Sequence, residues 1–282
     1  MVSKSQGIIL NFDSLILCPS DTVFMKLTIL GSGTSVPSLK RGSPGLVIKA
    51  GGKILLFDSG SGTLRRMLEA GITYHDIDYI FYTHIHPDHV ADLVPFLFAT
   101  KYADIPREKN LDIVGGKGFK KFFKKLNKVY GKWLEPELYK IKVREIFNKS
   151  VDFGDFRVTT KSLAHIKESV GYRIEAKACS ERSESNGKSI VVSGDTDYCK
   201  NIVNLGKGAD LLILECSLPD KKRVAGHLTP SLCGRIAAES KCKKLVLTHF
   251  YPSCEDIDVA GLCRKYYNGE IVIAEDLMKI MI

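Results

Sequence analysis

The sequence predicts a layered α/β fold in which two β-sheets lie between outer helices. Glycine turns, apolar runs and helical stretches alternate along its 282 residues, without an internal repeat or a low-complexity segment. The only plausible linker, Ser180–Lys188, is short and joins two predicted strands, which favours one domain. The chain is 44% hydrophobic and 26% charged, the composition of a globular protein that buries a substantial core.

The first half is expected to contain strands and three helices, one of which is the lysine-rich helix described below. Strands are predicted at Lys26–Leu30, Gly45–Lys49, Lys53–Asp58, Ile77–Tyr82 and Leu111–Val114. The second and third of these are joined by Gly51-Gly52, which is a hairpin signal. Helices are predicted at Thr63–Ala70 and Val90–Tyr102.

The second half continues the same alternation. Strands are predicted at Lys140–Phe147, Phe156–Ser162, Val170–Glu175, Ser189–Val192, Leu211–Leu214, Leu245–Leu247 and Glu270–Ile273. Helices are predicted at Cys199–Leu205 and Ser231–Ser240.

Residues 1–24 are interpreted as an N-terminal extension of a domain that spans residues 25–282, because the first predicted strand begins at Lys26. The short apolar run Gly7–Phe12 ends at Asp13, and the three regions of a signal peptide are not all present. No stretch approaches the roughly 18 apolar residues that a membrane-spanning helix needs. The eight cysteines form no C-x-x-C pair and no compact framework, so we expect reduced thiols and a cytoplasmic protein.

Three histidines and an aspartate are packed into six positions directly after the predicted strand Ile77–Tyr82. They are His84, His86, Asp88 and His89. Metal ions bind neutral imidazoles and carboxylates that converge from a rigid base, so this segment predicts a metal site. A polar surface loop is the alternative, but such a cluster would be rare by chance in a chain with seven histidines. His75 falls outside the pattern and is expected at the surface.

This motif is similar to the signature of the metallo-β-lactamase superfamily, and the resemblance extends from Met25 to the C-terminus. It implies a four-layer αββα sandwich whose remaining ligands follow strands, at His165, Asp195 and His249. It implies one metal site formed by His84, His86, His165 and Asp195. It implies a second formed by Asp88, His89, His249 and the same Asp195, which would bridge the two ions. Taken alone, His165 and His249 would equally suit structural roles.

The resemblance implies a hydrolase with two Zn²⁺ ions, although Mn²⁺ or Fe would also fit the nitrogen and oxygen ligands. Two ions about 3.5–4 Å apart activate water at neutral pH and hold an electrophilic oxygen. Asp88 is therefore counted among the catalytic residues as well as the ligands. Flavodiiron relatives generally carry an acidic residue in place of the second histidine, and His86 keeps that histidine, so hydrolysis is preferred over redox chemistry.

Glu215, at a strand end, and His227, before a predicted helix, resemble a pair in the ribonuclease Z-like phosphodiesterases. The pair implies that Glu215 orients His227, which would protonate the leaving oxygen of a phosphodiester. The alternatives are structural roles, in which His227 is a residue near the cap of a helix and Glu215 belongs to a buried ion pair. Gly31–Thr34 and Gly171–Arg173 also resemble this branch, and Asp58 matches a position that braces the histidine loop.

One feature departs from ribonuclease Z. Those enzymes usually carry a long arm, rich in glycine and proline, that holds tRNA. In bacterial forms the arm lies between the positions that match His165 and Asp195, where this chain has only 29 residues. The arm is therefore expected to be absent. Its absence argues against tRNA processing and favours a smaller or cyclic phosphodiester as the substrate.

The net charge of +9 and the pI near 9.0 favour polyanionic partners such as nucleic acid. Part of this charge lies on Lys117, Lys120, Lys121, Lys124, Lys125, Lys128 and Lys132, with no acid between them. Phe119, Phe122, Phe123 and Leu126 fall at helical spacing, which predicts an amphipathic helix with a lysine face. That face is either a solvated surface or a phosphate-binding one.

The first expectation is a cytoplasmic, zinc-dependent phosphodiesterase that acts on RNA or on a smaller, cyclic phosphodiester. The second is a hydrolase of C–N, C–O or C–S esters, like lactamases or glyoxalase II. The third is a nucleic-acid-binding protein whose metals are structural. No membrane partner is expected, and a homodimer is left open.

Overall fold

The computed structural model describes residues 25–177 and 187–282. The predicted extension 1–24 and most of the predicted linker Ser180–Lys188 lie outside the described residues, so the predicted boundaries of the domain stay a prediction. The described residues form two mixed sheets of seven strands each.

The first sheet contains the N-terminal strands and the last strand of the chain. In spatial order it consists of β14 (Lys279–Met281), β1 (Lys26–Gly31), β2 (Gly45–Ala50), β3 (Lys53–Phe57), β4 (Tyr79–Phe81), β5 (Leu111–Gly115) and β6 (Ile141–Glu145). Pairing is antiparallel from β14 to β3 and parallel from β3 to β6. Gly51 and Gly52 turn between β2 and β3 with φ of 55° and 71°, which confirms the predicted hairpin.

The second sheet is arranged in the same way. In spatial order it consists of β13 (Glu270–Ile273), β12 (Lys244–Thr248), β11 (Leu211–Glu215), β10 (Ser189–Val192), β9 (Val170–Ala176), β8 (Phe156–Ser162) and β7 (Ser150–Asp152). Strands β13 to β10 are parallel, and β10 to β7 are antiparallel.

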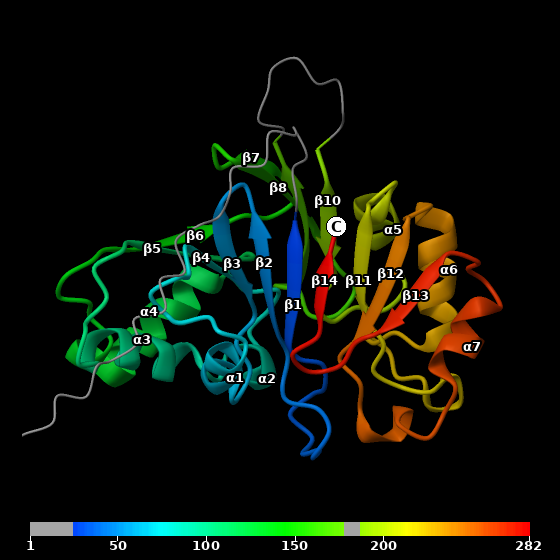
Figure 1. Cartoon of the computed structure of the whole chain (residues 1–282), viewed down its shortest axis with the longest axis horizontal. Helices are drawn as coiled ribbons and strands as arrows, with labels where there is room; N and C mark the ends of the chain where they lie inside the picture. Colours follow the sequence, from blue (N-terminus) through cyan, green and yellow to red (C-terminus); the bar gives the residue numbers. More distant parts are fainter. Residues whose placement is uncertain (1–24, 178–186) are drawn as a thin grey trace, which may run out of the picture.

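Helices cover the outer face of each sheet. The helices that connect strands of the first sheet are α1 (Thr63–Glu69), α2 (Pro87–Val90), α3 (Leu93–Tyr102) and α4 (Phe119–Tyr130). Those that connect strands of the second sheet are α5 (Lys200–Gly206), α6 (Pro230–Ser240) and α7 (Val259–Arg264). Short 3-10 turns lie at Gly131–Trp133, Asp220–Lys222 and Pro252–Cys254. Figure 1 shows α1–α4 on one side of the paired sheets and α5–α7 on the other. The predicted αββα sandwich is confirmed.

The prediction of one continuous helix over Val90–Tyr102 was wrong, because the chain turns at Ala91 and Asp92 between α2 and α3. The amide of Asp92 donates to the carbonyl of Ser59, not to a carbonyl one helical turn earlier. The side chain of Asp92 accepts hydrogen bonds from the amides of Gly62 and Leu64, at 3.2 and 2.9 Å, and so caps the first turn of α1.

The core between the sheets is apolar and aromatic. Phe57 of β3 and Phe81 of β4 stack with ring centroids 4.9 Å apart, and Tyr172 of β9 contacts both rings edge-on. Burial of side chains of this kind stabilises the fold by roughly 1.5–3 kcal/mol each. The hydroxyl of Tyr172 also donates to the carbonyl of Tyr82, at 2.7 Å, and so ties the second sheet to the segment that carries the histidine motif.

The parallel strands of both sheets end at one edge of the sandwich, where ligands usually bind in α/β proteins. At that edge Asp58 follows β3 and the histidine motif follows β4, while Asp195, Glu215 and His249 lie at the ends of β10, β11 and β12. Within residues 25–177 and 187–282, no helix combines the length and apolar character needed to cross a membrane.

Candidate metal centre

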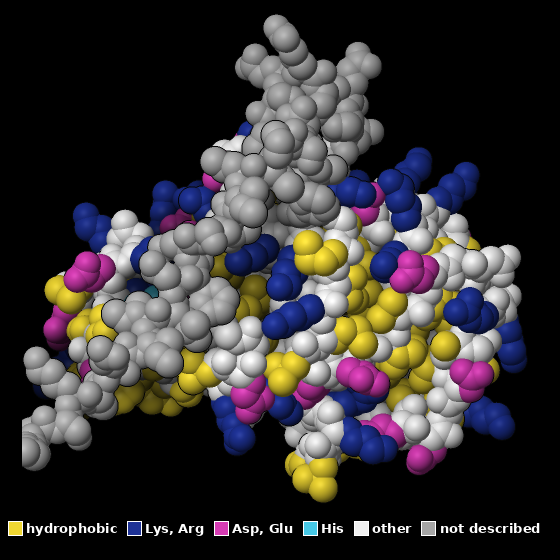
Figure 2. All heavy atoms as spheres, in the orientation of Figure 1, with side chains coloured by type: hydrophobic (Ala, Val, Ile, Leu, Met, Phe, Trp, Pro, Cys, Tyr) yellow, Lys and Arg dark blue, Asp and Glu magenta, His cyan; other side chains and the backbone are white. Residues whose placement is uncertain are grey.

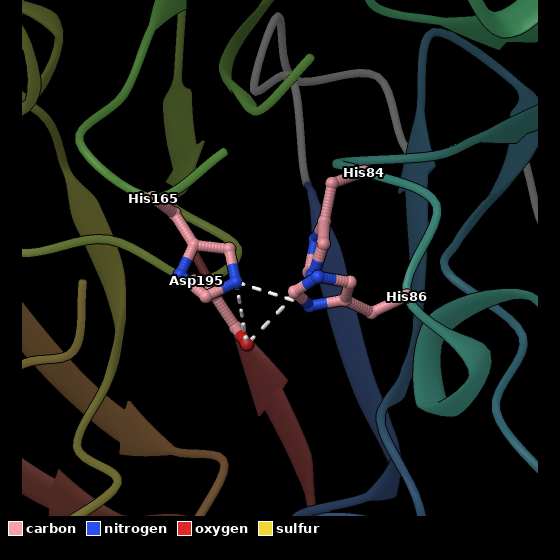
Figure 3. Close-up of side chains that lie close together, drawn as sticks. All are labelled: His84, His86, His165 and Asp195. Carbon is pink, nitrogen blue, oxygen red and sulfur yellow. Dashed lines mark hydrogen bonds and ion pairs between the residues drawn. The ribbon is translucent and has the colours of Figure 1, made fainter. Parts of the chain in front are cut away.

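The first group of predicted ligands converges from both sheets. His84, His86, His165 and Asp195 each offer a ligand atom, and these atoms lie within 4.8 Å of one another. Figure 3 shows the three imidazoles and the carboxylate pointing toward a common space. Nε2 of His165 lies 3.1 Å from Nδ1 of His86. Oδ2 of Asp195 lies 3.8 Å from Nε2 of both His84 and His165.

The second group lies beside the first. Asp88, His89 and His249 also bring their ligand atoms within 4.8 Å of one another. The Nε2 atoms of His89 and His249 are 3.2 Å apart. Oδ2 of Asp88 lies 3.4 Å from Nε2 of His249 and 3.8 Å from Nε2 of His89.

Asp195 lies between the two groups and faces both. While Oδ2 faces the first group, Oδ1 lies 3.3 Å from Nε2 of His89 and 3.3 Å from Nε2 of His249. All seven predicted ligands are therefore brought together, and the position of Asp195 fits the bridging role that the resemblance implied.

The spacing of the donor atoms suits ligation of metal ions better than hydrogen bonding within the cluster. A tetrahedral ion with bonds of about 2.0–2.1 Å holds its nitrogen ligands about 3.3 Å apart, close to the nitrogen pairs described above. Nε2 of His84 and Oδ1 of Asp195 are buried and have no hydrogen-bond partner among the described residues. Such buried polar atoms are rare without a ligand, so the cluster is consistent with a metal-binding site.

Four imidazoles are oriented through the ring nitrogen that points away from the centre. Their Nδ1 atoms contact Thr83 Oγ1 (His84, 3.1 Å), Asp58 Oδ2 (His89, 2.8 Å), the Gly226 carbonyl (His165, 2.9 Å) and Ser217 Oγ (His249, 3.0 Å). These acceptors fix the tautomer in which Nε2 is free to bind a metal ion. His86 is the exception, because its Nδ1 faces the centre.

Asp58 braces the histidine loop, as the resemblance implied. Its carboxylate accepts hydrogen bonds from the amide and the hydroxyl of Thr83, each at 2.8 Å, and from Nδ1 of His89. Asp58 has φ of 55°, a left-handed conformation that is uncommon outside glycine, and these three bonds hold it there.

Glu215 and His227 form the predicted pair. Nδ1 of His227 lies 3.0 Å from Oε1 of Glu215, and the His227 ring lies 4.8 Å from that of the predicted ligand His165. The other carboxylate oxygen accepts from the hydroxyl of Ser217 at 2.6 Å, and Ser217 accepts from His249. Glu215 thus positions His227 directly and the predicted ligand His249 through Ser217.

Burial and charge set the protonation of the cluster. Burial lowers the pKa of His84 and that of His165, which keeps both imidazoles neutral, as metal binding requires. Burial alone would raise the pKa of Asp195, but the neighbouring His249 and His89 hold it well below its usual range. For His227, burial lowers the pKa, whereas the hydrogen bond and the charge of Glu215 raise it, and the pKa is raised overall.

Three functional contacts were not predicted from the sequence. Thr83 and Ser217 carry hydroxyls that orient the predicted ligands His84 and His249, and Gly226 supplies a carbonyl to His165. The neighbours of these residues in sequence, His84, Glu215 and His227, were the only available signal. His75 is half-buried and lies outside both ligand groups.

An αββα sandwich with a His/Asp cluster at the shared edge of its sheets defines a protein of the metallo-β-lactamase superfamily. YhfI of Bacillus subtilis, a metallo-β-lactamase fold protein, matches with a TM-score of 0.76 and 25% identity, over 92% of this chain and 100% of that one. The short form of human tRNase Z matches with a TM-score of 0.72 and 26% identity, over 90% and 98%. The ribonuclease Z of Archaeoglobus fulgidus is 27% identical over an alignment of 306 positions, which covers 92% of this chain and 98% of that relative.

A family model described as "Anti-Pycsar protein Apyc1" matches residues 25–266, and the chain belongs to this family. The predicted superfamily and its ribonuclease Z-like branch are confirmed.

Replacing Asp58 tests whether the outer contacts support metal binding. Asp58→Ala is expected to weaken one of two zinc-binding events by about 10- to 100-fold, because His89 loses the partner that fixes its ring. Zinc titration with a competing chelator measures both events. Asp258→Ala removes the aspartate that caps α7 and serves as the control. Equal titration curves for wild type and Asp58→Ala would contradict the bracing role.

Proposed function

We propose that this protein is a phosphodiesterase that uses two zinc ions to hydrolyse P–O bonds of RNA. The observation that carries the proposal is the Glu215–His227 pair beside the two ligand groups, since a positioned proton donor suits an alkoxide leaving group. Ribonuclease Z of Archaeoglobus fulgidus and ribonuclease BN of Cronobacter sakazakii, 27% and 28% identical to this chain, support RNA as the substrate.

The proposal assigns both groups of donor atoms to metal ions. His84, His86 and His165 would hold one ion, Asp88, His89 and His249 the other, and Asp195 would bind both. Zinc is proposed because imidazole nitrogens dominate, while Mn²⁺ or Fe remain alternatives. When bound, two such ions activate water at neutral pH and offset the charge that develops on the phosphate.

Two side chains would handle protons. Glu215 occupies Nδ1 of His227, which leaves Nε2 to donate a proton to the leaving oxygen. The raised pKa of His227 keeps more of this imidazole protonated near neutral pH. Burial raises the pKa of Asp88, but the hydrogen bond from His249 and the charge of His89 lower it overall, so Asp88 is ionised and can also orient the attacking water.

A smaller or cyclic phosphodiester is the second candidate substrate. The 29 residues between His165 and Asp195 include β9 and β10, and the described residues there form only these strands and short connections. A long arm for holding tRNA does not fit in that length. The six described cysteines are free thiols, which supports the proposed cytoplasmic location.

A substrate panel tests the proposed reaction. Zinc-loaded protein is expected to hydrolyse bis(p-nitrophenyl) phosphate and to cleave a short RNA or a cyclic nucleotide. It should act far more slowly on p-nitrophenyl acetate, a thioester and a β-lactam, because a dedicated proton donor beside the metals suits a P–O bond. Preference for any of these carbon esters would contradict the proposal, and binding of RNA without turnover of any substrate would favour a binding protein with structural metals.

His227→Ala tests the proton donor. We expect turnover of RNA, which has a poor leaving group, to fall by a factor of roughly 10² to 10⁴. Hydrolysis of bis(p-nitrophenyl) phosphate should change little, because p-nitrophenolate leaves without a proton, and metal content should be retained. His75→Ala, outside the ligand groups, is the matched control. Near-normal turnover of RNA by His227→Ala would exclude this role.

A further inference from the structure

A groove of about 550 Å³ lies between the start of α4 and the loop that follows His165. It is lined by four lysines, Lys117, Lys121, Lys125 and Lys167, and by one acid, Glu168. Glu168 pairs with Lys167 at 3.7 Å, whereas none of the other three lysines forms an ion pair within the described part of the chain. By contrast, on the face shown in Figure 2, Lys and Arg side chains are spread over both halves with acidic side chains among them. The groove therefore concentrates unneutralised positive charge.

The same groove has aromatic and apolar walls. Phe122 of α4, Phe147 after β6 and Ile85 of the histidine motif line it, and each is only partly buried. Lysines along aromatic rings are the combination that binds single-stranded nucleic acid, since phosphates pair with the ammonium groups and bases stack on the rings. Phe122 and Phe147 also pack against the core, so the aromatic walls are held in place while they line the groove.

The groove is held rigidly against the metal centre. Phe119 at the start of α4 stacks on Tyr82, two residues before His84, with centroids 5.2 Å apart and an interplanar angle of 19°. Gly116, before α4, packs so closely on the loop after His165 that a Cβ there would lie 2.3 Å from the carbonyl oxygen of Glu168. Both anchors fix the lysines relative to the ligands.

The N-terminus of α4 is already occupied by the protein itself. Oε1 of Glu145 accepts hydrogen bonds from the amides of Gly118 and Lys120, each at 2.9 Å. An anion in the groove would therefore be bound by the lysine side chains and not by the end of the helix.

Ile85 lies between the ligands His84 and His86 in the chain, so the groove borders the metal centre. We propose that this groove binds the single-stranded RNA that flanks the scissile phosphodiester, with its phosphates on Lys117, Lys121 and Lys125 and a base against Phe122 or Phe147. This inference rests on the proposed function, because it extends the substrate outward from the metals.

Lys121 and Lys125 lie one helical turn apart and face the groove, whereas Lys124 and Lys128 are exposed but are not among the described residues that line it.

Two double variants of one helix separate the groove from general charge. Lys121→Glu/Lys125→Glu changes the groove, and Lys124→Glu/Lys128→Glu changes the net charge equally outside it. Affinity for a ten-nucleotide single-stranded RNA is measured in zinc-loaded protein over a range of salt concentrations. The groove variant is expected to reduce the log–log salt slope by about 1.4, for two lost phosphate contacts at roughly 0.7 each. The control variant should keep most of the wild-type slope.

Hydrolysis of bis(p-nitrophenyl) phosphate by the same proteins separates the two claims. It should be equal in wild type and both variants, since this substrate reaches only the metal centre. Equal RNA slopes for the two double variants would overturn the groove and leave the phosphodiesterase intact. Absence of any phosphodiester hydrolysis in wild type would instead overturn the proposed function.

Phe122→Leu tests the aromatic wall. Loss of one stacked base is expected to weaken binding of the same RNA by about 5- to 150-fold, while binding of inorganic polyphosphate, which has no bases, stays unchanged. Equal weakening for both ligands would show a structural effect of the substitution, and equal retention would show that no base lies on Phe122. Either result would overturn the stacking contact.

Discussion

The carboxylate of Asp195 faces two groups of histidines at once, and the surrounding structure keeps those groups in place. Its two oxygens face different groups of imidazoles. Within the first group, nitrogens of His86 and His165 lie 3.1 Å apart, and within the second, nitrogens of His89 and His249 lie 3.2 Å apart. Two of these buried atoms, Nε2 of His84 and Oδ1 of Asp195, have no hydrogen-bond partner among the described residues, and burial of polar groups in that state is costly. Metal binding at this position would therefore stabilise the site, in addition to the chemistry proposed for it.

Each sheet supplies one carboxylate that holds the side chains around Asp195 in place. Asp58, at the end of β3, fixes Thr83 and His89, while Glu215, at the end of β11, fixes His227 and acts on His249 through Ser217. These acceptors decide which nitrogen of each ring meets the centre. The proposed proton donor His227 and the predicted ligand His249 thus depend on one carboxylate, that of Glu215, which couples their positions.

Much of this arrangement could be predicted because its signals are local in sequence. Four ligands fall within six positions, and the others follow apolar strands in the order typical of the superfamily. Contacts between distant segments gave no such signal. The edge strand β14 was missed because it has only three residues, of which the first and the last are exposed. It is held in the sheet by pairing with β1, which is distant in sequence. The break at Asp92 depends on backbone groups of another segment, and the groove joins Phe147 and Lys167 to α4 only in three dimensions.

The most direct test of the account is the number of metal ions that the protein binds. Elemental analysis combined with zinc titration should give about two ions per chain for wild type. In Asp195→Ala both binding events should weaken, because one carboxylate serves both groups. Saturation of wild type at one ion, or a variant that binds two ions with unchanged affinity, would contradict the shared centre.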